Sequence, residues 1–148
     1  MNPATLDHAG IAARIPHRGS MCLLHSLDRW TADSVFCSAL SHTDPAHPLR
    51  SAQGLLAPVA IEYAAQAMAL HGGLSAPVGS PPTPGFLASV RGVKFRVPRL
   101  DDIPGALRVS AQKLAGDERQ AMYSFALHSE QGALLVEGRA TVILNALP

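Results

Sequence analysis

The C-terminal half of the chain alternates between apolar and polar residues with a period of two. Apolar side chains recur at every second position in four short segments, 93–97, 107–112, 121–127 and 136–144. This alternation is typical of strands that bury one face against a core. Because the segments follow one another at short spacing, they predict an antiparallel meander of four strands.

One earlier segment departs from this pattern because it is long and apolar on every side. The polar side-chain atoms between positions 58 and 70 belong to three residues only, Glu62, Tyr63 and Gln66. Pro58 suits a first helical position, alanines favour the helix and a glycine pair follows it, so we expect a helix over 58–71. A helix that is apolar all round must be wrapped by other structure, and the sheet is expected to curl about it.

The N-terminal half predicts a short helix at 4–13 and two strands, "MCLLHSLDRW" and "SVFCSALSH". With 148 residues and no internal repeat, we expect one domain, 1–148, of the α+β class. In it, an antiparallel six-stranded sheet is wrapped around one long central helix. The free edges of such a sheet predict a homodimer formed through an edge.

Charge and composition argue against several classes of function. The formal net charge is +1 and 16% of the residues are charged, which gives no long-range field to attract nucleic acid. No apolar run approaches the roughly 20 residues of a membrane span, so we expect a soluble, cytoplasmic protein without nucleic-acid or membrane partners. Cys22 and Cys37 lack zinc spacing, and no phosphate loop or metal-ligand cluster occurs, so no metal or cofactor is expected.

Glu62 needs an explanation because it is a carboxylate in an apolar helix. An ion left unpaired in a low-dielectric core is costly, so it must be paired, hydrogen-bonded or neutralised. Gln66 lies four positions later on the same helical face. On charge and spacing alone, a structural anchor and a functional carboxylate are equally good interpretations. His47, in the loop before the helix, favours the functional one, because an imidazole and a carboxyl near a helix start make an acid–base pair.

Three segments, "IPHRGSMCLL", "IEYAAQA" and "GVKFRVPRLDDIPGAL", occur in the order found in a known family. They resemble the hotdog-fold 3-hydroxyacyl-[acyl carrier protein] dehydratases of the FabA/FabZ type, from about Ile15 to Leu144. "HPL" and "IEYAAQAMALHG" are more similar still to a divergent branch found with aryl-polyene and polyketide-type synthesis systems. The resemblance implies a hotdog fold and two active sites at a homodimer interface.

In that family a histidine of one subunit faces a glutamate of the other, and the matching residues here are His47 and Glu62. The implied reaction dehydrates a 3-hydroxyacyl thioester on acyl carrier protein to a trans-2-enoyl thioester, in fatty-acid or polyene-type biosynthesis. Neutral His47 would take the C2 proton. Glu62, with its pKa raised by burial, would stay protonated and donate to the leaving hydroxyl.

Further residues have supporting roles in this prediction. A backbone N–H at the helix start, that of Ala57 or Val59, would stabilise negative charge on the thioester oxygen. Gln66 would orient Glu62 or serve as a satisfied core amide. Tyr63 would line the core or an acyl tunnel.

Two of the departures from the family keep alternatives open. The step from His47 to Glu62 is one residue longer, and Leu56-Ala57 replaces the family's Pro-Gly pair. A hotdog thioesterase would use Glu62 to activate water, with less need for His47. A non-catalytic hotdog subunit would instead support a partner dehydratase in a heteromer. His17 is expected to be a loop histidine that fixes the first turn.

The parts of the substrate that do not react, the acyl chain and its carrier protein, must also be bound. An acyl chain is expected in a tunnel lined by the helix alanines, Phe86 and Leu87. Acidic carrier protein requires a basic surface, for which the candidates are Arg91, Lys94, Arg96 and Arg99. A solvated strand face is the simpler interpretation of these four.

Overall fold

The structure, a computed structural model, describes residues 2–76 and 85–144. Its main elements are α1 His8–Ala12, β1 Ser26–Trp30, β2 Ser34–Ala39, α2 Ala60–Ser75, β3 Gly85–Phe95, β4 Leu107–Gly116, β5 Gln120–His128 and β6 Leu134–Leu144. Short 3₁₀ turns lie at Gly19–Met21, Ser41–Thr43 and Ala57–Val59. The order of the main helices and strands is the predicted one.

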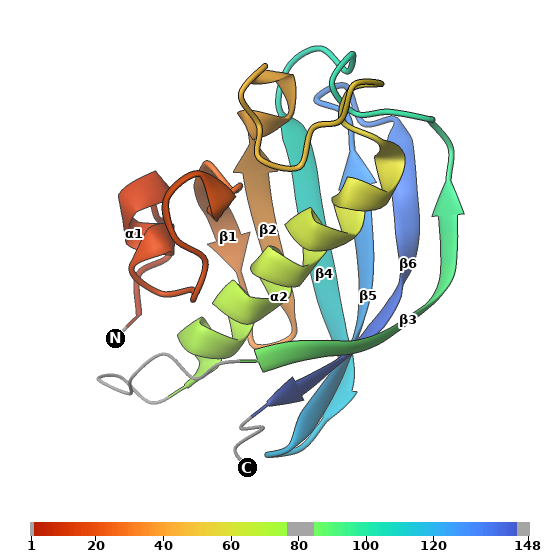
Figure 1. Ribbon diagram of the computed structural model, residues 1–148. Helices are drawn as coiled ribbons and strands as arrows, with labels where there is room; N and C mark the ends of the chain where they lie inside the picture. Colours follow the sequence, from red (N-terminus) through yellow and green to blue (C-terminus); the bar gives the residue numbers. More distant parts are fainter. Residues whose placement is uncertain (1, 77–84, 145–148) are drawn as a thin grey trace.

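All six strands form one antiparallel sheet in the order β1-β2-β4-β5-β6-β3. The sheet curls around α2, which lies across its inner face (Figure 1). The predicted meander is wrong at its first strand, because β3 pairs with β6 while β4 pairs with β2. Alternation shows which face a strand buries but not which strand lies beside it. Among the described residues, β3 is therefore an outer strand with one neighbour.

The helix α2 begins and ends later than predicted. Pro58 lies in the 3₁₀ turn Ala57–Val59, and the α-helix runs from Ala60 to Ser75. The glycine pair does not stop it, although a glycine inside a helix costs about 1 kcal/mol relative to alanine. Leu70 and Leu74, on either side of the pair, are buried in the core. Tertiary packing therefore sustains the last turn.

The predicted alternation describes burial in β4 and β5 well. Their core-facing residues are buried: Val109, Ala111, Tyr123, Phe125 and Leu127. The residues between them are half-buried or exposed. The inner face of the sheet thus packs on α2, while the outer face carries the polar side chains.

His71 fixes the C-terminal part of α2 to the sheet. Its Nδ1 lies 2.8 Å from the Tyr123 hydroxyl and its Nε2 lies 2.9 Å from the Thr31 carbonyl. Because a carbonyl only accepts, Nε2 carries the proton and Nδ1 accepts from the tyrosine. Burial lowers the pKa of His71, so the imidazole is a neutral link between helix and sheet.

The N-terminal elements are shorter than predicted. α1 covers five residues, and Asp7 caps it by accepting from the Gly10 N–H at 2.8 Å. β1 begins only at Ser26, because part of the segment before it bonds to a side chain of α2. Cys22 and Cys37 are buried free thiols, and burial raises the pKa of Cys37 to about 12. In the part of the chain that is described, no helix is long and apolar enough to cross a membrane.

Candidate active site

Gln66 joins α2 to the segment that precedes β1. Its buried Oε1 accepts from the Leu23 N–H at 2.9 Å, and its Nε2 donates to the Met21 carbonyl at 2.7 Å. These contacts fix which end of the amide is the oxygen. The second amide hydrogen then donates to Glu62 Oε1 at 3.2 Å. Gln66 is thus a satisfied core amide that also contacts the carboxylate, and its role in orienting Glu62 for a reaction stays a prediction.

Glu62 lies in the first turn of α2, and two donors hold one of its oxygens. His17 Nε2 lies 3.0 Å from Oε1, beside the Gln66 contact, and the Glu62 side chain is 32% exposed. The hydrogen bond from His17, helped by Gln66, lowers the pKa of Glu62 against the opposing effect of burial. The predicted raised pKa is therefore wrong. Donors to the carboxylate outweigh its desolvation, and the group is ionised at neutral pH.

His47 lies in the loop before α2, where its imidazole is enclosed. Nδ1 accepts from the Leu49 N–H at 3.0 Å, and Nε2 lies 3.1 Å from the Tyr63 hydroxyl. The residue is only 5% exposed, and burial lowers its pKa. Because Nδ1 accepts, the proton of the neutral ring is on Nε2 and donates to Tyr63. Both nitrogens are thus engaged, whereas the predicted C2-base role requires a nitrogen that can accept a proton.

Tyr63 is a core residue at the centre of a directed chain of hydrogen bonds. Its hydroxyl lies 2.7 Å from Ser41 Oγ, which donates to the Leu23 carbonyl at 2.8 Å. Since the serine donates onward, it accepts from Tyr63, which in turn accepts from His47. Burial raises the pKa of Tyr63 to about 12. The chain is neutral and saturated.

The two predicted catalytic residues have different partners within one chain. Glu62 contacts His17, whereas His47 contacts Tyr63, the next residue along the helix. Successive residues of a helix point about 100° apart, so the two contacts lie on different sides of α2. A pairing of His47 with Glu62 across a subunit boundary stays a prediction.

The role of His17 was missed by the sequence analysis. Its ring contacts the Glu62 carboxylate instead of serving only the loop. The available signal was that "IPHRG" belongs to one of the segments that resemble the dehydratases. Local spacing gave no indication, because the two residues lie far apart in the sequence and meet only through folding.

Both predicted backbone donors at the helix start already have acceptors. The Ala57 N–H donates to the Pro98 carbonyl and the Val59 N–H to the Leu56 carbonyl, each at 3.0 Å. The first contact flanks a bridge between Leu56 and Arg99, and the second closes the 3₁₀ turn. The prediction of an unpaired oxyanion donor is therefore wrong for both groups.

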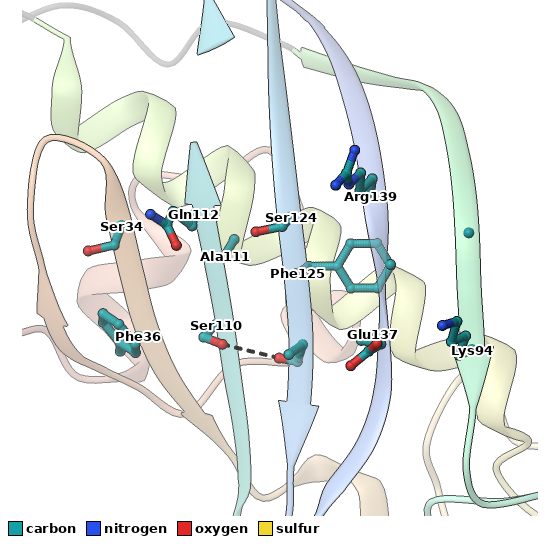
Figure 2. A pocket seen from close by; sticks show the side chains of 13 residues that line it. Ser34, Phe36, Lys94, Ser110, Ala111, Gln112, Ser124, Phe125, Glu137 and Arg139 are labelled. Atoms are coloured by element: carbon teal, nitrogen blue, oxygen red, sulfur yellow. Dashed lines mark hydrogen bonds between the residues drawn. The ribbon is translucent and has the colours of Figure 1, made fainter. Parts of the chain in front are cut away.

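A hollow of about 570 Å³ lies on the face of the sheet turned away from α2 (Figure 2). Ser110 and Ser124 are among the small residues that line it, and Lys94, Glu137 and Arg139 lie on its β3–β6 side. None of the predicted site residues lines this hollow. This hollow and the acid–base groups are thus separate features.

Two further expectations concern the acyl tunnel and the absence of a metal site. Leu87 is exposed in the single chain, and the side chain of Phe86 lies outside the described residues. Within residues 2–76 and 85–144, no three His, Cys, Asp or Glu side chains lie close enough to hold a metal ion.

An antiparallel six-stranded sheet curled around one central helix defines a hotdog-fold protein, here with a carboxylate in the first turn of that helix. The chain belongs to the ApeP-like family, described as ApeP dehydratase, which matches residues 9–146. This match confirms the predicted resemblance to hotdog dehydratases.

Several solved structures share the fold. The dehydratase heterocomplex ApeI:P from Xenorhabdus doucetiae is similar at 24% identity and a TM-score of 0.76, over 90% of each chain. AziG from S. sahachiroi is similar at 14% identity and a TM-score of 0.60, over 80% of this chain and 88% of that one. A thioesterase from Haemophilus influenzae is similar at 13% identity and a TM-score of 0.57, over 80% and 76%. No curated protein sequence matches the chain.

Proposed function

We propose that this chain dehydrates 3-hydroxyacyl thioesters on acyl carrier protein to trans-2-enoyl thioesters, in fatty-acid or aryl-polyene biosynthesis. The observation that carries the proposal is the Glu62 carboxylate, in a member of a dehydratase family. It is ionised, partly exposed and bonded through Oε1. Among the described residues, no group bonds Oε2, so one oxygen is available to substrate. Carrier-bound substrates place the reaction in the cytoplasm.

In the proposed reaction Glu62 moves one proton from carbon to oxygen. Oε2 accepts the C2 proton, and the electron pair of the C2–H bond passes through the enolate to form the C2–C3 double bond. As the C3–O bond breaks, the new carboxylic acid returns its proton to the departing hydroxide, which leaves as water. Glu62 ends ionised, as it began. This revises the predicted mechanism, in which Glu62 begins as the acid.

His47, Tyr63 and Gln66 are positioning residues in this proposal. Gln66 fixes the direction of the Glu62 side chain. The contact between His47 and Tyr63 holds the loop against the start of α2. His47 would act as the C2 base only after releasing the Leu49 N–H from Nδ1.

A second hotdog chain, identical or related, is the proposed partner at the edge strand β3. Three large apolar side chains of this strand are exposed: Leu87, Val90 and Phe95. An outer strand with apolar side chains favours pairing with another strand. The similar ApeI:P structure is itself a heterocomplex. A partner here would complete the enclosure of the substrate.

The carrier protein would meet the basic side chains of β3 and of the segment that follows it in this proposal. Arg99 is engaged by Asp101, and Arg96 lies 4.0 Å from Glu137. Arg91 and Lys94 are exposed, and neither has an ion pair within the described residues. They are the better candidates for contact with an acidic carrier.

A non-catalytic subunit is the second candidate function, and the engaged state of His47 favours it. An imidazole with both nitrogens bonded contributes structure rather than proton transfer. In this case the chain would lend its surface to an active dehydratase partner.

The deciding experiment incubates the purified chain with 3-hydroxyacyl carrier protein, alone and with a co-expressed hotdog dehydratase. Mass spectrometry distinguishes loss of water from release of free carrier thiol. Enoyl product that requires Glu62 of this chain, alone or in the complex, supports the proposal. Free thiol supports the thioesterase alternative. Product from the complex that is indifferent to Glu62→Gln supports the non-catalytic subunit.

A further inference from the structure

The two oxygens of the Glu62 carboxylate have unequal surroundings. Oε1 receives both neighbouring donors, His17 Nε2 at 3.0 Å and Gln66 Nε2 at 3.2 Å. Oε2 has no hydrogen-bond partner in the part of the chain that is described. A carboxylate anchored through one oxygen keeps its direction while the other oxygen remains available to a ligand.

The protonation of His17 follows from its second nitrogen. Nδ1 is buried and, within the described residues, has no hydrogen-bond partner. A proton on Nδ1 would leave a buried N–H without an acceptor, which is costly. The proton of a neutral ring is therefore best placed on Nε2, where it donates to Glu62 Oε1.

His17 is brought to Glu62 by contacts outside its own side chain. Gln66 bonds the backbone of Met21 and Leu23, a few positions after His17. The same amide contacts Glu62, so one side chain of α2 aligns both the segment and the carboxylate. Among the described residues, His17 is the one titratable group in direct contact with Glu62.

We infer that His17 is a positioning residue for Glu62, whose Nε2–H holds Oε1 so that the ionised carboxylate presents Oε2 to the C2 proton. The inference rests on the proposed function for its catalytic part. The hydrogen bond lowers the pKa of Glu62. The carboxylate is therefore ionised at neutral pH and can accept a proton without first losing one. Loss of His17 should leave the fold intact, but it should raise the pKa of Glu62 and remove the contact that orients its carboxylate.

The first test measures the titration of Glu62 without any assay of activity. The chain holds four glutamates, so protein labelled with ¹³C at the glutamate carboxyl gives few signals, and Glu62→Gln assigns the relevant one. His17→Leu should raise the titration midpoint of Glu62 by about one pH unit. His17→Gln, which retains an N–H donor, should raise it by less. An unchanged midpoint in folded His17→Leu would overturn the inference.

The second test asks whether the contact between His17 and Oε1 affects the reaction proposed at Oε2. In whichever assembly is active, His17→Leu should lower kcat about tenfold and leave KM within about twofold. The acidic limb of the pH profile should move upward by the same interval as the NMR midpoint. His17→Gln should restore most of kcat. A lower kcat with an unmoved limb would contradict the positioning role.

His25→Leu is the matched control, because His25 is an exposed histidine of the same N-terminal part of the chain. It should change neither the Glu62 midpoint nor the pH profile. Absence of dehydration in every assembly would refute the proposed function, whereas the NMR midpoint still decides the pairing of His17 with Glu62. The two failures are thus distinguishable.

Discussion

Two adjacent residues of α2, Glu62 and Tyr63, each contact a histidine, with opposite chemical results. The Glu62–His17 contact is partly exposed and involves one oxygen of a charged group. The Tyr63–His47 contact is buried and belongs to a neutral chain in which the polar atoms already have partners. The Glu62–His17 pair therefore retains a carboxylate oxygen that can accept a proton, whereas the Tyr63–His47 pair stabilises the loop before α2.

This contrast shows that residue type alone does not assign a catalytic role. His47 and Tyr63 are acid–base side chains by composition, yet both are buried and their polar atoms already have partners. Glu62 is in the same apolar helix as Tyr63, but its donors keep it charged and its exposure keeps it accessible. Four experiments test this difference between Glu62 and the His47–Tyr63 pair.

Replacing Glu62 by glutamine should have the largest effect. The amide keeps the size and the contact with Gln66 but cannot accept a proton, so kcat should fall by about 10²–10⁴-fold. Dehydration of a 3-hydroxyacyl carrier protein measures it. Glu137→Gln, the same chemical change on the outer face of the sheet, is the control and should retain activity. Equal activity of both variants would end the assignment of Glu62.

His47→Ala should act mainly on stability. It leaves the buried Tyr63 hydroxyl and the Leu49 N–H without their partner, which should cost about 1–3 kcal/mol of unfolding free energy. Urea unfolding measures this loss, and kcat of the folded variant should fall less than tenfold. A kcat loss as large as that of Glu62→Gln would restore the imidazole as a base.

Tyr63→Phe should cost less, about 1 kcal/mol, because the ring still fills the core. His47 and Tyr63 share one hydrogen bond, so the double variant should lose less stability than the two single losses together. Urea unfolding of the four proteins gives this coupling. Strict additivity would show that the contact contributes nothing in solution.

The smallest effect concerns the pH dependence of stability. The pKa of Glu62 is lowered from 4.5, so its contribution is complete above that value and is lost as pH falls below it. The pKa of His47 is lowered from 6.5, so the unfolded chain binds protons more readily and stability falls below pH 6.5.

Unfolding free energies measured across the acid range separate these two contributions. Removing His47 should flatten the slope below pH 6.5, and Glu62→Gln only the part below 4.5. Burial also lowers the pKa of His42 and His71, but both groups remain in each variant. The Glu62 contribution should be slight, because its partial exposure screens the interaction. If Glu62→Gln changed the slope of unfolding free energy against pH near neutrality, that would contradict the lowered pKa of Glu62.

The general architecture could be predicted because it follows from periodicity. Alternation fixed the inner faces of β4 and β5, and the apolar run at α2 required a sheet that curls. The position of β3 could not be predicted, because strand pairing depends on the path of the chain after the helix. The helix also continued through its glycines, since packing of Leu74 outweighed local propensity.

The polar residues near the start of α2 could be recognised from the sequence, whereas the protonation state of Glu62 could not be predicted. The sequence identified Glu62, Gln66 and His47 as polar groups near one helix start. It did not reveal that His17 donates to Glu62, because this contact arises from folding of the N-terminal segment. Without that donor, burial alone predicts a raised pKa, and the sign of the shift comes out wrong.

The amide of Gln66 couples the N-terminal segment to α2. The segment cannot swing away from the helix while its bonds to Met21 and Leu23 persist, and breaking them also frees the amide that steadies Glu62. Opening of the N-terminal segment and loss of the Gln66 contact with Glu62 are therefore expected to occur together. The exchange rate of the Leu23 amide with deuterium should report how often the segment opens and Gln66 releases its backbone contacts.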